Sequence, residues 1–320
     1  MSAITREIEL RADTGLNLLE IDAIVAELSR LRESSLEERQ RQHRPPKLPS
    51  RKALAGILDG LCAVLFPNRL GLGVSEFTDG GIDYFVGHTL DVTLRKLFEQ
   101  VRLELQLAVS DEEDKDSVRT QAKMITRRFA ARLPAVRVLL DSDIAAAFEG
   151  DPAARSVDEI LACYPGVMAV IYHRLAHELF QLDACLIARM ISEIAHSLTG
   201  IDIHPGAQIG GNFFIDHGTG VVIGETAIIG QRVRLYQAVT LGAKRFPVDE
   251  NGVLIKGYAR HPIVEDGVVV YAGATILGRI TIGAGSTIGG NVWLTHSVPP
   301  GSNITQARVT AETFEGGAGI

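Results

Sequence analysis

From residue 1 to about 199, hydrophobic residues recur at the spacing of amphipathic helices. The clearest sets are Leu18, Leu19, Ile21, Ile24, Val25 and Leu28, and then Leu90, Val92, Leu94, Leu97, Val101 and Leu105. Further helices are expected over about 118–133, 165–181 and 184–198. Asp151 followed by Pro152 predicts another helix start, because proline is tolerated in a first turn. The charged, proline-containing segment 33–52 predicts an exposed connector, and residues 1–199 as a whole predict an all-helical N-terminal domain.

After Gly200 the hydrophobic period changes to six residues. Three in-phase sets follow: Ile203, Ile209, Ile215 and Val221; Ile223, Ile229, Leu235 and Leu241; and Val264, Val270, Ile276, Ile282, Ile288 and Leu294. Each hexad is expected to form a short strand and a turn, and three hexads to make one coil of a parallel β-helix. The aliphatic residues then stack inside the coils. Residues 200–305 therefore predict a β-helix domain, and the fold class is α+β.

The repeat is interrupted at two places, and interruptions of a solenoid map to loops that often form its binding face. The first is a two-residue shift of phase at 216–220, and the second is an excursion over 243–262. The shift places Asp216 and His217 where the coil is forced out of register. Their side chains are therefore expected to leave the hydrophobic stack.

Composition narrows the class of protein. The 320 residues are 46% hydrophobic with a formal net charge of −7, which argues against nucleic acid as the main partner. Three widely spaced cysteines fit a reducing compartment and form no zinc or disulfide pattern. No apolar run is long enough to span a bilayer, and the charged N-terminus does not read as a signal peptide. We expect a cytoplasmic protein with no membrane partner.

Candidate acid–base chemistry lies at the first interruption. His217 has a carboxylate neighbour, Asp216, and flanking glycines, so we favour a general base over a histidine that only caps a turn. Asp202 could orient the imidazole as the third group of a triad does. It could equally be a corner residue that begins a strand. The segments of Asp202 and Asp216 fall within one coil of each other but on different faces, and whether they meet depends on subunit packing or on the geometry of the corner.

The second interruption carries Arg260 and His261. An arginine there could hold a carboxylate through two hydrogen bonds, although the bare sequence favours a solvated loop arginine. His204 and Glu225 are interpreted as corner and turn residues. The i,i+4 pair His173 and His177 lacks a further ligand and is interpreted as a helix-face pair.

Taken together, DIHP, DHGTGVVIGETA, TLGA and RHP, in this order along a hexapeptide repeat, resemble the bacterial serine O-acetyltransferases. The resemblance covers the chain well from Asp151 to the end, and the longer N-terminal part resembles the long-chain bacterial branch. It implies a left-handed β-helix. It also implies acetyl transfer from acetyl-coenzyme A to L-serine, which gives O-acetylserine for cysteine synthesis. Acetyl-coenzyme A would be a co-substrate, with no permanently bound cofactor and no metal.

The resemblance also implies roles for individual residues. His217 would be the general base and Asp202 its carboxylate partner. Asp151 and Asp216 would receive the serine ammonium, and Arg260 and His261 would hold the carboxylate and hydroxyl region. Three residues would line the coenzyme A wall: Gly242, Ala243 and Ala272. These residue types fit the chemistry, because an ordinary histidine pKa near 6.5 suits proton removal from a hydroxyl. Backbone N–H groups at a tight corner would stabilise the oxyanion.

The tail and the assembly follow from the same resemblance. Residues 306–320 are expected to be a flexible tail whose last residue, Ile320, enters the active site of O-acetylserine sulfhydrylase. The alternative is a disordered end without a partner, as termini usually are, but a terminal isoleucine after an acidic, glycine-rich stretch favours the partner. Related β-helix enzymes pack as trimers with active sites between subunits, so a trimer or a dimer of trimers is expected. Inhibition by L-cysteine would use the serine site.

Two departures from the family pattern concern the coenzyme side: Ala243 replaces a common second glycine, and the excursion is long. Three other interpretations stay open at this point. One is a hexapeptide acyltransferase for homoserine or a sugar, although the charged residues favour an amino acid. Another is a non-catalytic scaffold that binds the sulfhydrylase. The third is a carbonic anhydrase of the same fold, which would need His204, His217 and His261 as metal ligands.

Overall fold

The computed structural model describes residues 18–38, 47–71, 79–109, 115–255 and 257–306. The chain divides into two units, 1–47 and 48–320. The first contains helix α2 (Leu18–Glu38). The second contains helices α3 (Arg51–Leu65), α4 (Pro67–Leu70), α5 (Asp79–Gln106), α6 (Lys115–Gly150), α7 (Val157–Cys163), α8 (Pro165–Phe180) and α9 (Cys185–Thr199), followed by the strands. The expected boundary at 199 therefore lies between helices and strands of one unit, and a division into separate domains there stays a prediction.

Three sequence expectations about helices are changed by the structure. The helix expected to end near residue 133 continues through Pro134 to Gly150. Proline in a helix interior costs about 3 kcal/mol, but Leu133 and Val136 on either side of it are buried in the core. The helix expected at Asp151 begins instead at Val157, where the Ser156 side chain caps it. Helices α2 and α3 also reach into the expected connector from both sides.

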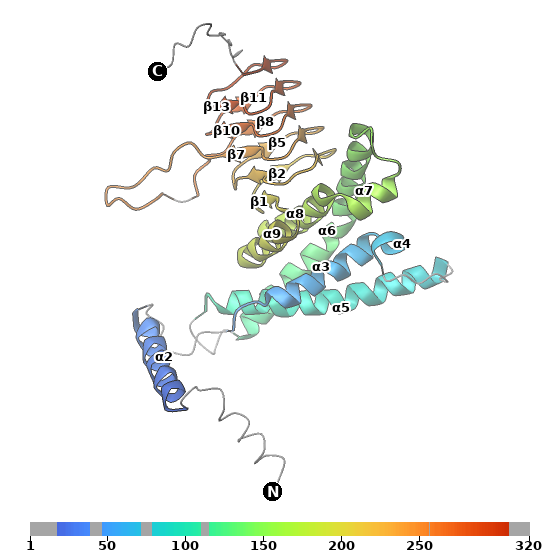
Figure 1. Cartoon of the computed structure of the whole chain (residues 1–320). Coiled ribbons are helices and arrows are strands. Elements are labelled where there is room, and N and C mark those ends of the chain that lie inside the picture. The colour runs from blue at the N-terminus through green and yellow to red at the C-terminus, as the bar shows by residue number, and fades with distance from the viewer. Residues whose placement is uncertain (1–17, 39–46, 72–78, 110–114, 256, 307–320) are drawn as a thin grey trace. The chain divides into compact units, whose positions relative to one another are not determined.

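The strands form a parallel β-helix, as Figure 1 shows by the row of stacked coils. Sheet A contains β1 (Asp202–Ile203), β4 (Val222–Ile223), β7 (Thr240–Gly242), β10 (Thr275–Leu277) and β13 (Trp293–Leu294). Sheet B contains β2 (Gln208–Ile209), β5 (Ile228–Ile229), β8 (Ile263–Val264) and β11 (Thr281–Ile282). Sheet C contains β3 (Phe214–Ile215), β6 (Arg234–Leu235), β9 (Val269–Val270), β12 (Thr287–Ile288) and β14 (Asn303–Ile304). From β1 to β13 successive strands pass from A to B to C, so the fold class predicted from the six-residue period is confirmed.

The register of the sheets explains the period. In sheet A, Ile203, Ile223 and Leu241 are paired directly, and all three are buried. Full burial of such a side chain contributes about 1.5–3 kcal/mol. The chain closes each coil at corners where residues adopt left-handed backbone, including His217 with φ of 59° and Gly218 with φ of 87°.

The helices cover the first coil. Helix α9 packs against β1, and α6 and α8 pack against β3 (Figure 1). A buried ion pair joins α6 to α8: Arg174 donates to Asp143 at 2.6 and 2.8 Å and also to the carbonyls of Ile209 and Gly210. The helical part therefore holds the turn that leads into β3 and the residues after it.

Candidate active site

The expected base lies at the corner between β3 and β4. The His217 side chain is 70% exposed, whereas the neighbouring Asp216 carboxylate is 9% exposed. Nε2 of His217 is 3.7 Å from Oδ1 of Asp216. The left-handed backbone at His217 turns the chain here, and an added Cβ at Gly218 would collide with Ile201. The corner therefore presents an accessible imidazole beside a buried carboxylate.

Asp151 reaches the same corner from the helical part. Its Oδ2 accepts a hydrogen bond from the Tyr164 hydroxyl at 2.5 Å, and its Oδ1 accepts the Ala153 N–H at 2.8 Å. These bonds lower the pKa of Asp151, with smaller contributions from Arg234 and His217. The same bond raises the pKa of Tyr164 to about 12, so the phenol stays a donor. The carboxylate of Asp151 is thus held ionised near Asp216 and His217. We call these three residues the base corner.

Asp202 lies next to this corner but is not bonded to His217. It is the first residue of β1, and no hydrogen bond or ion pair between the two occurs in the described part of the chain. The backbones are nevertheless adjacent, because Gly220 donates to the Gly200 carbonyl at 2.8 Å and Gly218 packs on Ile201. The structure therefore brings the two segments together without joining the side chains.

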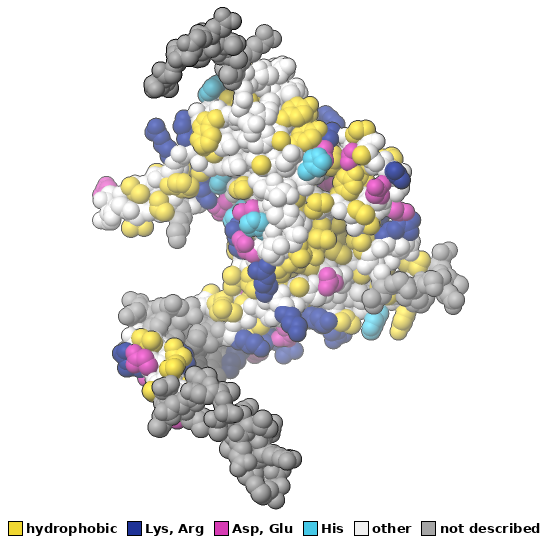
Figure 2. All heavy atoms as spheres, in the orientation of Figure 1, with side chains coloured by type: hydrophobic (Ala, Val, Ile, Leu, Met, Phe, Trp, Pro, Cys, Tyr) yellow, Lys and Arg dark blue, Asp and Glu magenta, His cyan; other side chains and the backbone are white. Residues whose placement is uncertain are grey.

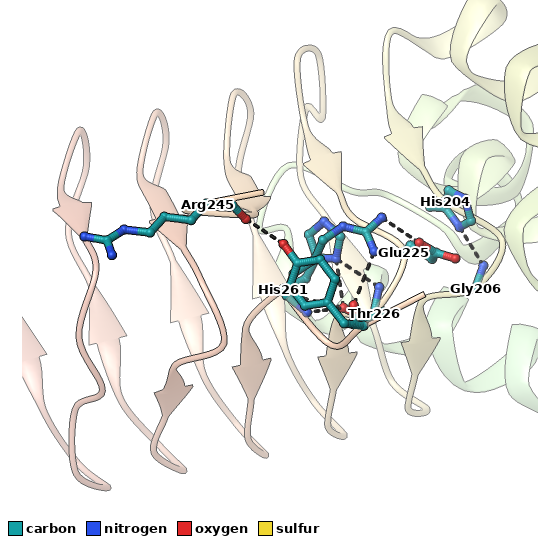
Figure 3. Close-up of polar contacts among 8 residues, drawn as sticks. His204, Gly206, Glu225, Thr226, Arg245 and His261 are labelled. Carbon is teal, nitrogen blue, oxygen red and sulfur yellow. Dashed lines mark hydrogen bonds and ion pairs between the residues drawn. The ribbon is translucent and has the colours of Figure 1, made fainter. Parts of the chain in front are cut away.

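Arg260 and His261 lie at a different corner, between sheets A and B. Figure 3 shows His261 there beside Thr226. Nη2 of Arg260 is 2.6 Å from Oε2 of Glu225. The Thr226 hydroxyl accepts the N–H groups of Arg260 and His261 at 2.9 and 3.1 Å. Arg279 donates to the carbonyls of Thr226 and His261. We call Glu225, Thr226, Arg260 and His261 the arginine corner.

His261 is held as a neutral donor. Its Nδ1 accepts the Thr226 N–H at 3.0 Å, so the ring proton of the neutral form lies on Nε2. Burial, with a smaller contribution from Arg260, lowers the pKa of His261 to about 4. An imidazole with this pKa and this tautomer can donate from Nε2 at neutral pH and is a poor base.

His204 lies nearby and is also disfavoured as a base. Its Nδ1 accepts the Gly206 N–H at 3.0 Å, and burial lowers its pKa (Figure 3). The ring packs edge-on against Phe180. These contacts fit the corner role that the sequence indicates.

The three residues expected on the coenzyme side do not meet in one chain. Gly242 ends β7 beside Leu277 of β10, where the excursion leaves sheet A, and Ala243 follows it. Ala272 lies at the opposite end of the strands of sheet A, just before β10, where its carbonyl accepts the Asn291 N–H at 2.9 Å. Ile320 lies outside the described residues.

Three residues that belong to the two corners or donate hydrogen bonds to them carried no signal in the sequence. Arg234 occupies the outward position before an inward leucine, which ordinarily faces solvent. Tyr164 precedes a helix, and Thr226 sits in a turn. Tyr164 donates to Asp151, Arg234 donates to Asp216, and the Thr226 hydroxyl accepts the Arg260 N–H. These hydrogen bonds depend on how distant segments pack together, which the sequence pattern does not show.

Two properties of the described residues bear on other classes of site. No group of three His, Cys, Asp or Glu side chains there could hold a metal ion. Among the helices in those ranges, none is both long and apolar enough to cross a membrane.

Comparison with known proteins identifies the family. A curated Synechococcus elongatus protein named "Serine acetyltransferase, plasmid" is 56% identical over 316 residues, which cover 98% of this chain and 97% of the relative. The serine acetyltransferase of Mycobacterium tuberculosis is 52% identical over 158 residues, covering 49% of this chain and 65% of the relative. The crystal structure of Entamoeba histolytica serine acetyltransferase 1 in complex with L-cysteine matches with a TM-score of 0.67 at 34% identity, over 85% of this chain and 96% of that chain. No family model matches the chain. The near full-length identity to the first relative shows that the chain belongs to the serine acetyltransferase family.

Proposed function

We propose that this protein transfers the acetyl group of acetyl-coenzyme A to the hydroxyl of L-serine, with His217 as the general base. The observation that carries the assignment is the base corner, where an exposed imidazole lies beside two carboxylates from separate parts of the fold. Family membership makes the protein an acyltransferase, and the corner supplies the groups for an amino acid acceptor.

The proposed reaction follows from these groups. His217 takes the proton of the serine hydroxyl, whose oxygen attacks the thioester carbonyl. The tetrahedral oxyanion collapses, the C–S bond breaks, and the coenzyme A thiolate takes the proton from the imidazolium. Asp202 is proposed to stabilise that imidazolium. The two side chains are not bonded in the structure, so His217 would have to rotate towards Asp202, whose segment lies beside its own.

Recognition of serine is proposed to use opposite charges. Asp151 and Asp216 receive the ammonium. Arg260 and the Nε2–H of His261 receive the carboxylate. The crystal structure of the Entamoeba enzyme is a complex with L-cysteine, an amino acid with the same two charges. We propose that L-cysteine binds this chain at the same site and inhibits it.

The two corners imply that a second copy completes the site. Strand β4 of sheet A runs from the base corner to the arginine corner, so the two corners lie at opposite ends of the strands of that sheet. Serine carries its ammonium and carboxylate on one carbon atom and cannot span the length between them. We therefore propose that neighbouring subunits of a trimer bring the base corner of one chain to the arginine corner of the next.

The excursion supports self-association. Its two arms meet through an antiparallel bridge between Val248 and Leu254. Five of its large apolar side chains are exposed: Phe246, Val248, Val253, Leu254 and Ile255. Figure 2 shows apolar side chains on this projecting arm. Such a group of apolar side chains on one loop marks an interaction surface.

Acetyl-coenzyme A is proposed to lie between subunits as well. Gly242 and Ala243 of one chain and Ala272 of the next would form the wall of the coenzyme A site, because these residues also lie at opposite ends of the strands of sheet A. The C-terminal Ile320 stays a proposed contact for O-acetylserine sulfhydrylase.

The test follows thiol release from acetyl-coenzyme A by purified protein with L-serine, homoserine or a sugar. We expect release with serine, and a loss of about 10²–10⁴-fold in kcat for His217→Ala. His196→Ala, on the exposed end of α9, is the matched control and should keep full activity. Release with homoserine or a sugar but not serine would overturn the acceptor. Full activity of His217→Ala would overturn the base. No release with any acceptor, while the protein binds the sulfhydrylase, would favour a scaffold.

A further inference from the structure

Arg234 joins the two carboxylate-bearing parts of the base corner. Its Nη2 donates to Oδ2 of Asp216 at 2.5 Å, and its Nη1 donates to the carbonyl of Gly150 at 2.6 Å. Gly150 is the last residue of α6, and Asp151 follows it directly. One guanidinium therefore connects the coil segment that ends in Asp216 to the helical segment that begins with Asp151.

The surroundings of Arg234 hold its side chain in place. The guanidinium carbon lies 4.9 Å from the ring centre of Phe214 and 4.6 Å from that of Tyr236. The side chain is 23% exposed. Its Nε is buried and has no hydrogen-bond partner among the described residues. Contacts with two rings and the hydrogen bonds of the two terminal nitrogens thus hold the guanidinium in place. Because the guanidinium is a planar fork, its two terminal nitrogens can donate to acceptors on different segments.

The bond to Asp216 also decides which oxygen of that carboxylate is free. Oδ2 is taken by Arg234, whereas Oδ1 faces His217 at 3.7 Å. An ammonium shared by Asp151 and Asp216 must therefore approach Oδ1. A ligand bound between two separate segments depends on their spacing, because a small misplacement weakens both contacts.

We infer that Arg234 is a positioning residue for serine: it holds the carboxylate of Asp216 at a fixed distance from Asp151 so that both receive one ammonium. The inference rests on the proposed role of those two carboxylates. Arg234 itself does not touch the substrate. Arg234 acts through the two hydrogen bonds that link Gly150 to Asp216. The charge of the guanidinium alone is not enough to position the Asp216 carboxylate.

The test compares Arg234→Met, which removes the charge and the fork, with Arg234→Lys, which keeps the charge but replaces the two separate terminal nitrogens by one ammonium. We expect both variants to raise KM for L-serine about tenfold while kcat changes less than about threefold, because orientation of the bound ammonium is lost. KM for acetyl-coenzyme A should stay unchanged. Arg232→Met is the matched control: its side chain is exposed two residues away, and it should behave as wild type.

Chemical rescue separates positioning from a general loss of structure. Arg234→Ala should leave a space between the two rings, and millimolar guanidinium should restore a low KM for serine, whereas the same concentration of sodium should not. Wild-type KM for serine in Arg234→Met would overturn the inference. So would full activity of Arg234→Lys, since charge would then suffice. A rise in KM for both substrates without rescue would show a structural role only.

Asp216→Asn keeps failure of this inference distinct from failure of the proposed site. If Asp216→Asn leaves KM for serine unchanged, the proposed ammonium site is wrong. If Asp216→Asn raises it and the Arg234 variants do not, only the positioning role is wrong.

Discussion

Gly224 makes room for the ring of His261. A Cβ at this position would lie 2.0 Å from Cδ2 and 2.1 Å from Nε2 of the buried imidazole. Gly224→Ala should therefore push the ring out of the arginine corner and cost about 1–3 kcal/mol of unfolding free energy. Serine-dependent acetyl transfer should fall with it. Urea unfolding and the thiol-release assay measure the two effects.

The control for this change is a glycine with free space around it. Gly56 lies within helix α3, and an added Cβ there meets nothing within 4 Å. Gly56→Ala should stabilise the protein by about 0.5–1 kcal/mol, because alanine loses less backbone freedom in a helix. Equal stability of Gly224→Ala and wild type would show that the ring adjusts freely.

Burial of neutral His261 predicts a pH dependence of stability. Its pKa is lowered to about 4 in the folded state, whereas an unfolded histidine titrates near 6.5. Between these values the unfolded chain binds the extra proton, so stability is complete above about pH 6.5 and falls as the pH drops towards 4. His261→Asn should lose less stability than wild type between pH 7 and 5.

Chemical denaturation at a series of pH values checks this slope. His296→Asn, at an exposed position, should follow the wild-type slope and serves as the control. If His261→Asn and wild type lose equal stability over the same interval, the imidazole is not held neutral by the fold.

Residue patterns could indicate the types of group in the site but not their partners. Asp216, His217, Arg260 and His261 stand out because they interrupt a regular repeat. Thr226 and Arg234 sit at ordinary turn and outward positions, and their roles come from elements distant in sequence. The pattern indicates a turn residue at Glu225 but not its ion pair with Arg260, because Arg260 lies on an element distant in sequence.

Between elements, the buried pair of Asp143 and Arg174 fixes helices α6 and α8 to the turn before β3. The two side chains are 4% and 5% exposed. Asp143 also accepts the Phe213 N–H at 2.9 Å. Asp143→Asn and Arg174→Met should each cost about 3–5 kcal/mol, because one buried charge loses its partner.

The double variant should cost less than the sum of the two single variants, by more than about 1 kcal/mol. The exposed pair of Asp91 and Arg95 on α5 is the control, with a coupling of about 0.3–0.5 kcal/mol. Unfolding free energies of the four variants of each pair give the coupling. An additive result for Asp143 and Arg174 would mean that the two charges are compensated elsewhere.

Helix boundaries show where local patterns mislead. Asp151 and Pro152 have the residue types of a helix start, but the Asp151 side chain accepts the Ala153 N–H and the Tyr164 hydroxyl instead. The helix begins later, where Ser156 accepts the Glu159 N–H and Glu159 accepts the Arg155 N–H. The capping pair of Ser156 and Glu159 thus competes with the helix-start signal of Asp151 and Pro152. The hydrogen bonds that Asp151 accepts favour the later start of the helix.

At the scale of the whole molecule, the β-helix was predictable because each coil repeats one inward position per hexad. Ile203, Ile223 and Leu241 lie in register as that period requires. The placement of the helical part was not predictable, since it depends on contacts such as Arg174 with the carbonyls of Ile209 and Gly210. The residue types of the proposed site were predictable but their arrangement was not, because the base corner and the arginine corner lie at opposite ends of the strands of sheet A.

That division of the site predicts complementation between inactive chains. His217→Ala disables the base corner and Arg260→Ala disables the arginine corner, so each variant alone should be inactive. In mixed trimers a site with both corners intact forms when the two neighbours carry opposite changes. Random mixing in equal amounts therefore restores about a quarter of the wild-type activity, as expected for a ring of head-to-tail contacts.

The matched control mixes His217→Ala with Asp216→Asn, which disable the same corner and should give no recovery. The measurement is serine-dependent thiol release after the two chains are unfolded together and refolded. Recovery in the first mixture alone would show that neighbouring subunits share the site. If neither mixture recovers while mixed trimers form, both corners must act within one chain. Serine would then have to reach both His217 and Arg260 of the same chain, although the strands of sheet A lie between these two residues in the structure.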